Sequence, residues 1–407
     1  PAVPAGPGPW GPGGGPPPSP HGPSSSPSAG VGYFAAPAAL PVVPAAPEAA
    51  PGRGSVGPAF GPLELAEGAP GWTAAVPFDA AVRLPDLGLM RVLPEDRASG
   101  RTWTIPVRGS FATAGWLEKK PGRGEDAEPT MRTHESGRAL IGVFDGVGGA
   151  GSATARRLRD NTELTGAYVA SRLARDLLES WYARVVRHQA SADDPGALRD
   201  WLQGGFRDEA EFIPATGLAL KGSLSRVLPT TMAAVAYELR PSEGRFLTIV
   251  DAFWAGDSRA YLLTPRSGLQ VLTVDDTRET DALALIRNDQ PMENMVSADQ
   301  QFTINHRRIQ IEGQAVLVVA TDGCFGYVKT PAHFEHLLLS QLAAAHSTED
   351  WSAGLLDTLA SFTGDDASFV LGSVGFERFA DIREAFSERG ALVKANHWVP
   401  FAQAEGD

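Results

Sequence analysis

Two apolar segments, each ending in an aspartate followed by glycine, constrain the fold of this 407-residue chain more than any other feature. Residues 139–144 (ALIGVF) lead into Asp145, and residues 315–320 (AVLVVA) lead, after one threonine, into Asp322. Short apolar runs bounded by turn residues predict buried strands. A strand end holds a carboxylate at the rim of a sheet, and the adjoining glycine leaves the main-chain carbonyl accessible. A single Asp-Gly pair usually marks only a turn, but two pairs on two strands predict a sheet with acidic groups at its rim.

The remaining pattern predicts strands in neighbouring pairs and helices in separate groups. We expect strands at residues 230–237, 246–252, 259–263, 269–274 and 368–374, and helices at residues 169–185, 195–212, 332–345 and 351–362. Asp257, Ser258 and Arg259 fall between two of these strands and are expected to form a hairpin turn with a buried ion pair. This order is typical of α+β layers rather than of alternating βαβ units.

Acidic residues occur in pairs at three further places, each bordering an apolar segment. The pairs are Glu125 and Asp126, Asp275 and Asp276, and Asp365 and Asp366. Hard divalent cations such as Mg²⁺ and Mn²⁺ prefer carboxylate, carbonyl and water oxygens. The sequence has no CxxC or HExxH pattern and its 8 histidines are scattered, so zinc ligation is not indicated. The acidic pairs predict a site built from oxygen ligands alone.

The charge balance excludes some classes of partner. The formal net charge is -13, with 48 acidic against 35 basic residues, which disfavours nucleic acid and anionic membranes because both require a basic surface. The sequence contains no run of about 18 apolar residues and no visible secretory signal. Its single cysteine, Cys324, excludes an internal disulfide and fits a reducing compartment. We therefore expect a cytoplasmic protein.

Composition also predicts the division of the chain. The first 50 residues hold 15 of the 33 prolines and one charged side chain, Glu48, and such segments cannot bury enough apolar surface to fold. We expect a disordered tail at residues 1–95, with a proline-rich docking segment for a partner's aromatic groove as the alternative. A folded domain is expected at residues 96–378. Residues 379–407 are expected to be a C-terminal extension, helical and then flexible, that packs on the domain or, alternatively, docks to a partner.

The order of the motifs resembles that of the PPM family, the type-2C metal-dependent serine/threonine phosphatases. The resemblance covers about Trp116 to Gly375, and residues 256–262 (GDSRAYL) are nearly identical to the family pattern. The matching segments are Glu125-Asp126-Ala127, residues 143–149 (VFDGVGG), Thr230-Thr231-Met232, residues 254–262 (WAGDSRAYL), residues 272–276 (LTVDD), residues 319–323 (VATDG) and residues 364–368 (GDDAS).

The resemblance implies an α+β fold, a four-layer α-β-β-α sandwich with two antiparallel sheets and two Mg²⁺ or Mn²⁺ ions at one end. It assigns the metal-site roles as follows: Asp145 bridges both ions, Gly146 offers its carbonyl, Glu125 binds the second ion, Asp322 and Asp365 complete the first site, Asp126 holds a metal-bound water, and Asp275 contributes with Asp322 to a looser third ion in some members.

The activity that the resemblance implies is hydrolysis of phosphoserine and phosphothreonine in proteins by direct attack of water activated by the two ions. Asp145 and Asp322 would be the catalytic carboxylates, and Arg123 would bind phosphate, with Lys119 and Lys120 as alternatives. A serine/threonine kinase is the expected counterpart. The alternative function is a catalytically silent PPM-fold binding or regulatory module, but silent members typically lose metal carboxylates, and all of them remain here.

Four departures from the family pattern concern the surroundings of the metal ligands. Val147 stands where the family has His or Met, Pro121 where it has a phosphate-binding Arg, Gly124 where it has Asn, and Asp276 where a His is common. The stretch between Gly149 and Ala170 is also longer than usual, which suggests an extra helix.

Overall fold

The computed structural model describes residues 72–74, 82–84, 88–90, 101–107, 110–134, 136–158, 161–213, 225–242, 245–277 and 292–406. The chain divides into two units, Pro1–Ala59 and Phe60–Asp407, and every described residue belongs to the second. Most of the predicted tail, including its proposed docking segment, lies outside the described residues.

The first sheet has six antiparallel strands in the order β1-β6-β7-β10-β11-β14. Their bounds are Trp72–Ala74, Thr130–His134, Arg138–Gly146, Thr230–Ser242, Arg245–Ala255 and Asn305–Glu312. The central strand β7 is the apolar run predicted before Asp145, and its interior is buried throughout. Asp145 lies opposite Thr231 of β10, so the register places the first acidic strand end at the rim of this sheet.

The second sheet also has six antiparallel strands, in the order β13-β12-β15-β16-β5-β4. Their bounds are Gly268–Val271, Arg259–Thr264, Ala315–Ala320, Ala367–Val374, Ser110–Leu117 and Arg101–Val107. Strand β15 is the second apolar run of the sequence, and all six of its residues are buried. Its central position explains the continuous apolar pattern, because both faces of the strand are covered.

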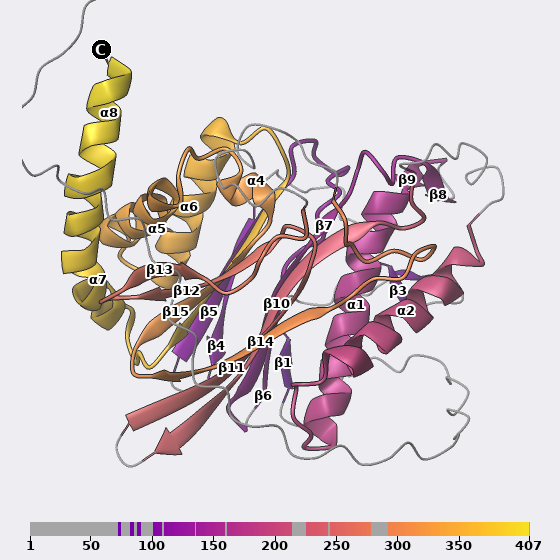
Figure 1. Cartoon of the computed structure of the whole chain (residues 1–407), viewed down its shortest axis with the longest axis horizontal. Coiled ribbons are helices and arrows are strands. Elements are labelled where there is room, and N and C mark those ends of the chain that lie inside the picture. Colours follow the sequence, from indigo (N-terminus) through magenta and orange to yellow (C-terminus); the bar gives the residue numbers. More distant parts are fainter. Residues whose placement is uncertain are drawn as a thin grey trace, which may run out of the picture. The chain divides into compact units, whose positions relative to one another are not determined.

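The two sheets pack face to face with helices on both outer surfaces (Figure 1). One core lies between the sheets and includes Ile141, Val235 and Leu317. A second core joins the first sheet to α1 (Gly166–Arg187) and α2 (Pro195–Ala210). The third joins the second sheet to α5 (Pro331–Ala344), α6 (Thr348–Phe362) and α7 (Phe379–Val393). The predicted four-layer α-β-β-α sandwich is therefore confirmed.

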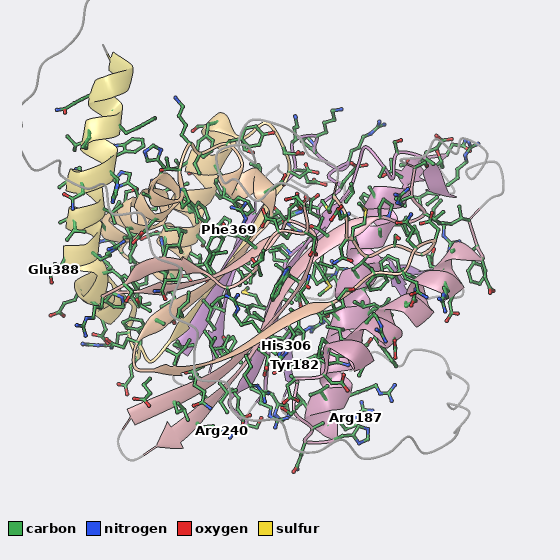
Figure 2. The ribbon with its side chains drawn as sticks, viewed as in Figure 1. Tyr182, Arg187, Arg240, His306, Phe369 and Glu388 are labelled. Carbon is green, nitrogen blue, oxygen red and sulfur yellow. The ribbon has the colours of Figure 1, made fainter. Side chains whose placement is uncertain are left out.

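Large side chains fill the two outer interfaces. In Figure 2, Phe369 of β16 lies on the side of α5 and α6, while Tyr182 of α1 lies on the side of the first sheet. The Tyr182 hydroxyl donates a hydrogen bond of 3.0 Å to the carbonyl of Ala139 in β7. This bond ties α1 to the central strand whose other end carries Asp145.

The long stretch before α1 forms a β-hairpin, so the expectation of an extra helix there is wrong. Strands β8 (Thr154–Arg157) and β9 (Glu163–Thr165) pair antiparallel. In the turn between them, Asn161 has a φ of 67°, a left-handed conformation that asparagine adopts more readily than most residues. The hairpin runs directly into the first residue of α1.

The C-terminal residues form a nearly continuous helical segment. Helix α7 is followed by a π-helical turn, η2 (Lys394–Trp398), and by α8 (Val399–Gly406). Ile382, Phe386 and Val393 are buried in the core beneath the second sheet, so α7 packs on the domain. The rings of His336 and Trp398 stack with their centroids 4.7 Å apart, which fixes η2 against α5.

Three short strands lie within residues 1–95. Strand β1 (Trp72–Ala74) pairs with β6 at the edge of the first sheet, and β2 (Val82–Leu84) pairs with β3 (Gly88–Met90). This part of the predicted tail therefore contains strand pairs, and the domain limits at residues 95 and 378 stay predictions. Within the described ranges, no helix has the length and apolar character that crossing a membrane requires.

Candidate active site

Four segments bring acidic side chains to one rim of the sandwich. Asp145 ends β7, and Asp322 begins the short helix α4 (Asp322–Phe325) after β15. Asp126 lies in the loop between β5 and β6, and Asp257 lies in the connection between β11 and β12. Asp145, Asp257 and Asp322 are half-buried at this rim, whereas Asp126 is buried.

Asp126 and Asp145 form a directly interacting carboxyl pair. The two carboxyls lie close enough that each affects the pKa of the other. Removal from water raises the pKa of both carboxyls well above the ordinary value, and nearby carboxylates raise it further. Asp126 Oδ2 also accepts hydrogen bonds from the hydroxyls of Thr321 at 2.9 Å and Ser368 at 2.7 Å. These bonds tie Asp126 to the ends of β15 and β16 in the second sheet.

Asp257 belongs to this cluster, although the sequence predicts only a turn at this residue. Burial, together with the charges of Asp322 and Asp275, raises its pKa to about 8. Its Oδ1 atom is buried and has no hydrogen-bond partner among the described residues. Asp257 also contributes to the raised pKa of Asp145. The sequence signal for this role is that Asp257 stands at the end of a strand, as Asp145 and Asp322 do.

The connection that carries Asp257 leads from the first sheet to the second. Gly256 has a φ of 96°, and a Cβ atom there would lie 2.7 Å from the Thr231 side chain, so only glycine fits. The hydroxyls of Thr231 and Ser258 lie 2.7 Å apart and link β10 to the start of β12. The predicted hairpin is therefore a crossing between sheets, and this crossing places Asp257 beside Asp145.

Glu125 is half-buried and is held on several sides. Its carboxylate Oε1 accepts a hydrogen bond of 2.8 Å from the Thr165 hydroxyl. Its backbone N–H donates to Asp366 Oδ2 at 2.6 Å, and its carbonyl accepts from the Ser171 hydroxyl at 2.5 Å. Burial raises the pKa of the Glu125 carboxyl, while the Thr165 hydrogen bond lowers it and the charges of Asp366 and Asp365 raise it.

The two residues of the pair Asp365 and Asp366 lie in different environments. Asp366 is buried, and its oxygens accept hydrogen bonds from the backbone N–H groups of Lys119 and Glu125. Asp365, to which the resemblance assigns a metal, is exposed, and its Oδ1 accepts from the Asp366 N–H at 2.9 Å. Asp366 thus anchors the loop that carries Glu125, a role that the sequence did not reveal.

Asp275 and Asp276 are engaged by protein groups. Asp275 binds Arg259 through both oxygens, at 2.8 and 2.6 Å, and the guanidinium lies 4.3 Å from the Phe325 ring centroid. Asp276 accepts hydrogen bonds from the Gly256 N–H and from the amides of Asn294 and Asn305. The ion pair expected within the Asp257-Ser258-Arg259 segment is therefore replaced by a pair between Arg259 and Asp275.

Gly146 lies against neighbouring backbone, whereas Arg123 is exposed to solvent. A Cβ atom on Gly146 would lie 2.5 Å from the Ala167 carbonyl oxygen and 2.7 Å from that of Glu125, so the close approach of α1 to β7 requires glycine. Arg123, Lys119 and Lys120 are all exposed in the loop before Glu125. All three side chains precede Glu125 by a few residues in the chain. The assignment of Arg123 to phosphate binding stays a prediction.

The donor set of this rim suits hard cations in its chemistry. It offers carboxylates whose mutual repulsion a divalent cation would relieve, together with the orphaned oxygen of Asp257. Within the described ranges, however, no group of three or more His, Cys, Asp or Glu side chains is arranged to hold an ion. Metal binding would therefore require side-chain adjustments at this rim.

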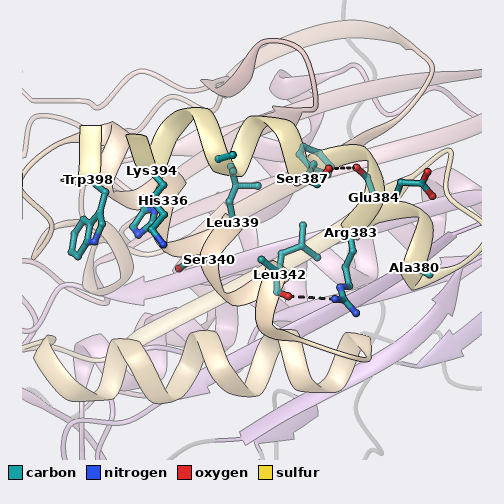
Figure 3. Close-up of a pocket in the computed structure, with 14 residues that line it drawn as sticks. His336, Leu339, Ser340, Leu342, Ala380, Arg383, Glu384, Ser387, Lys394 and Trp398 are labelled. Carbon is teal, nitrogen blue, oxygen red and sulfur yellow. Dashed lines mark hydrogen bonds between the residues drawn. The ribbon is translucent and has the colours of Figure 1, made fainter. Parts of the chain in front are cut away.

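A separate cavity lies far from these carboxylates, between α5 and α7 (Figure 3). It encloses about 720 Å³, and its lining includes His336, Arg383, Lys394 and Trp398. None of the predicted site residues lines it. The acidic rim and this cavity are distinct places on the molecule.

No protein-family model and no curated protein matches the chain. Solved structures similar to it include a bacterial serine phosphatase (16% identity, 69% of this chain and 100% of that chain, TM-score 0.43). Another is the serine/threonine phosphatase Stp1 from Staphylococcus aureus (17% identity, 70% and 98%, TM-score 0.43). A third is the catalytic domain of the serine/threonine protein phosphatase PstP in complex with two manganese ions (16% identity, 68% and 99%, TM-score 0.41). Similarity at this level carries no argument about activity.

The layer order and sheet pairing of the chain itself do establish its class of fold. Two antiparallel six-stranded sheets face each other, each is covered by helices, and the motifs of the resemblance lie at the ends of β7, β11 and β15. The chain has a PPM-type phosphatase fold.

Proposed function

We propose that the protein is a metal-dependent phosphatase that hydrolyses phosphoserine and phosphothreonine in proteins. The observation that carries this proposal is the convergence of Asp126, Asp145, Asp257 and Asp322 on one rim, where burial and neighbouring carboxylates raise the pKa values of Asp126, Asp145 and Asp257. Perturbed carboxyls gathered in this way are typical of functional sites. The PPM-type fold supports the same reaction class.

The residues that would hold two Mg²⁺ or Mn²⁺ ions are those of the family pattern. They are Asp145, Asp322, Asp365, Glu125 and the Gly146 carbonyl, with Asp126 holding a bound water, and a third ion would involve Asp322 with Asp275 or Asp257. When bound, divalent cations would acidify a water at neutral pH and neutralise charge on the phosphoryl oxygens.

The protein's own groups prepare this rim for charged ligands. Thr321 and Ser368 donate to Asp126 Oδ2 and keep that oxygen an acceptor. The pKa values of Asp126 and Asp145 are raised, so protons have to leave this rim as a cation binds, because metal ligands bind in their deprotonated form. Arg123, exposed in the loop before Glu125, would orient the substrate phosphate. Metal binding is therefore expected to release protons and to strengthen as pH rises.

The expected partner is a phosphorylated protein, and the opposing enzyme would be a serine/threonine kinase. The surroundings are expected to be cytoplasmic. The second candidate, a silent PPM-fold binding or regulatory module, is favoured by the lack of a preformed ion site among the described residues. The two candidates differ in one measurable property, which is turnover in the presence of metal.

Hydrolysis of p-nitrophenyl phosphate by the full chain tests the proposal. We expect activity with Mn²⁺ or Mg²⁺, complete loss in EDTA and recovery when excess Mn²⁺ is added. Release of phosphate from a phosphothreonine peptide would then establish the substrate class. A well-folded chain that binds Mn²⁺ without turning over either substrate would instead identify the silent module.

A second prediction concerns Asp275. Because both of its oxygens bind Arg259, we expect Asp275→Asn to lower the free energy of unfolding by about 1–3 kcal/mol and to leave Mn²⁺ affinity near that of the wild type. Asp257→Asn, in the connection between β11 and β12, is the comparison variant, and we expect it to weaken Mn²⁺ binding at high metal concentration. Thermal melting and calorimetric titration measure the two quantities. Weaker Mn²⁺ binding by Asp275→Asn at unchanged stability would return the third-ion role to Asp275.

A further inference from the structure

The hairpin formed by β8 and β9 ends at Thr165, whose side chain contacts the Glu125 carboxylate. The Thr165 hydroxyl donates to Glu125 Oε1 at 2.8 Å and accepts the backbone N–H of Tyr168 at 3.1 Å. A hydroxyl can do both, because it has one proton to donate and two lone pairs. Thr165 is thus the N-cap of α1 and a partner of Glu125 at once.

The place of Thr165 is set by contacts on both sides of the hairpin. The Gly166 N–H donates to the Ala153 carbonyl at 2.8 Å, and the Ala167 N–H donates to the Gly151 carbonyl at 3.1 Å. On the outer side, the Arg156 Nε donates to Glu209 of α2 at 2.8 Å, and Glu209 is buried. The hairpin therefore bridges α2 and the start of α1.

Side chains in the first turns of α1 also form hydrogen bonds with the main chain at Glu125 and Gly124. The Ser171 hydroxyl donates to the Glu125 carbonyl, and the buried Arg172 donates to the Gly124 carbonyl at 3.2 Å. Gly148 lies against the carboxylate, since a Cβ atom there would lie 1.9 Å from Glu125 Oε2. The carboxylate thus lies between Gly148 and the Thr165 hydroxyl, with little freedom to rotate away.

We infer that Thr165 is a positioning residue for Glu125: the hairpin delivers its hydroxyl to Oε1, and that contact orients the carboxylate for a divalent cation. The inference rests on the proposed function, because Glu125 is taken as a metal ligand. Groups that orient metal ligands are typically worth about 10- to 100-fold in metal affinity. An isosteric Thr165→Val change removes the donor without changing the shape of the side chain.

Calorimetric titration of the full chain with Mn²⁺ tests this inference. We expect Thr165→Val to weaken Mn²⁺ binding by about tenfold or more, and Thr165→Ser, which keeps the hydroxyl, to bind nearly as the wild type does. Thr165→Gly is the second variant if the valine protein folds poorly, because glycine is a tolerated N-cap. Glu125→Gln, measured alongside, reports the full contribution of the carboxylate.

A Thr330 variant serves as the control for loss of a helix cap, because Thr330 caps another helix in the same way as Thr165. Thr330 caps α5, on the opposite face of the sandwich, by accepting the N–H of His333 at 3.3 Å. We expect Thr330→Val to lower the melting temperature as Thr165→Val does and to leave Mn²⁺ affinity unchanged. Equal Mn²⁺ affinity for Thr165→Val and the wild type, or equal weakening by Thr330→Val, would overturn the inference.

The same titration separates this inference from the proposed function. If the wild type binds Mn²⁺ and Glu125→Gln binds it weakly while Thr165→Val does not differ from the wild type, only the positioning role fails. If the wild type does not bind Mn²⁺, or Glu125→Gln binds it as tightly as the wild type, the metal site itself fails and the role of Thr165 fails with it.

Discussion

Asp145→Asn is expected to abolish metal-dependent phosphatase activity, with a loss on the order of 10³-fold in kcat/KM or more. Asp145 stands at the end of β7, where burial and the charges of Asp126, Asp322 and Asp257 all raise its pKa. If Asp145 binds both cations as proposed, its loss would forfeit several kcal/mol of charge stabilisation in the transition state, and each 1.36 kcal/mol is about tenfold in rate. Initial rates on p-nitrophenyl phosphate with saturating Mn²⁺ measure the effect.

The substitution should leave the metal-free fold intact. An asparagine at position 145 can still donate a hydrogen bond to Asp126, and it removes one of the charges that repel each other at this rim. We therefore expect Asp145→Asn to melt in EDTA at the same temperature as the wild type or higher, which would separate loss of chemistry from loss of folding.

A matched control is available on the same sheet. Asp251 of β11 is buried and binds His306 at 2.9 Å and Arg308 at 2.8 Å, away from the acidic rim. Asp251→Asn should reduce stability, because it weakens these contacts, and should retain turnover per folded molecule. Retained activity in Asp145→Asn, or equal loss in both variants, would contradict the two-cation mechanism.

The second large effect is a loss of stability of the metal-free protein as pH rises from 7 to 8. Asp126, Asp145 and Asp257 have raised pKa values, and that of Asp257 is about 8. The folded state therefore retains protons that the unfolded chain releases near pH 4. Because the folded state binds more protons, the free energy of unfolding falls with pH, by at most about 1.4 kcal/mol per pH unit for each such group.

Groups whose titration increases stability as pH rises act below pH 7. Burial lowers the pKa values of His333 and His336, so these residues favour unfolding at acidic pH and increase stability as pH rises towards 6.5. Glu179 and Asp251, with lowered pKa values, act in the same direction below about pH 4. Between pH 7 and 8 in EDTA, we expect the melting temperature to fall, and added Mn²⁺ to restore it.

Asp257→Asn identifies the source of this dependence. Its neutral side chain removes the titration whose pKa is about 8, so the variant should show a flatter decline between pH 7 and 8, whereas Asp251→Asn should keep the wild-type slope. A melting temperature in EDTA that is constant or rises over this window would show that the carboxyls are already ionised in the folded protein.

Local patterns in the sequence predicted the strands and several of the acidic positions. The apolar runs before Asp145 and Asp322 became central strands of the two sheets, and the grouping of strands and helices predicted α+β layers. These predictions succeeded because strand burial and turn formation depend on neighbouring residues. The expectation of an extra helix before α1 was wrong, because the length of a segment alone does not distinguish a hairpin from a helix.

Within the acidic pairs, sequence reasoning could not say which residue faces which partner. Asp366 is buried and Asp365 exposed, although they are adjacent. Asp275 binds Arg259, while Asp257, expected in a turn, lies in the cluster with Asp145. Burial and hydrogen bonding of an acidic side chain depend on groups far away in the chain, and identical residue types therefore acquire different roles.

The sequence by itself determined the layered α+β fold, the oxygen-donor chemistry of the candidate site and the strand ends at which Asp145 and Asp322 stand, because periodicity and residue type act over a few positions. Only the tertiary structure decided that Asp257 joins these two and that Thr165 contacts Glu125. Those contacts span 40 residues or more in the chain, and they arise only when the two sheets and α1 pack together and remove the carboxylates from water.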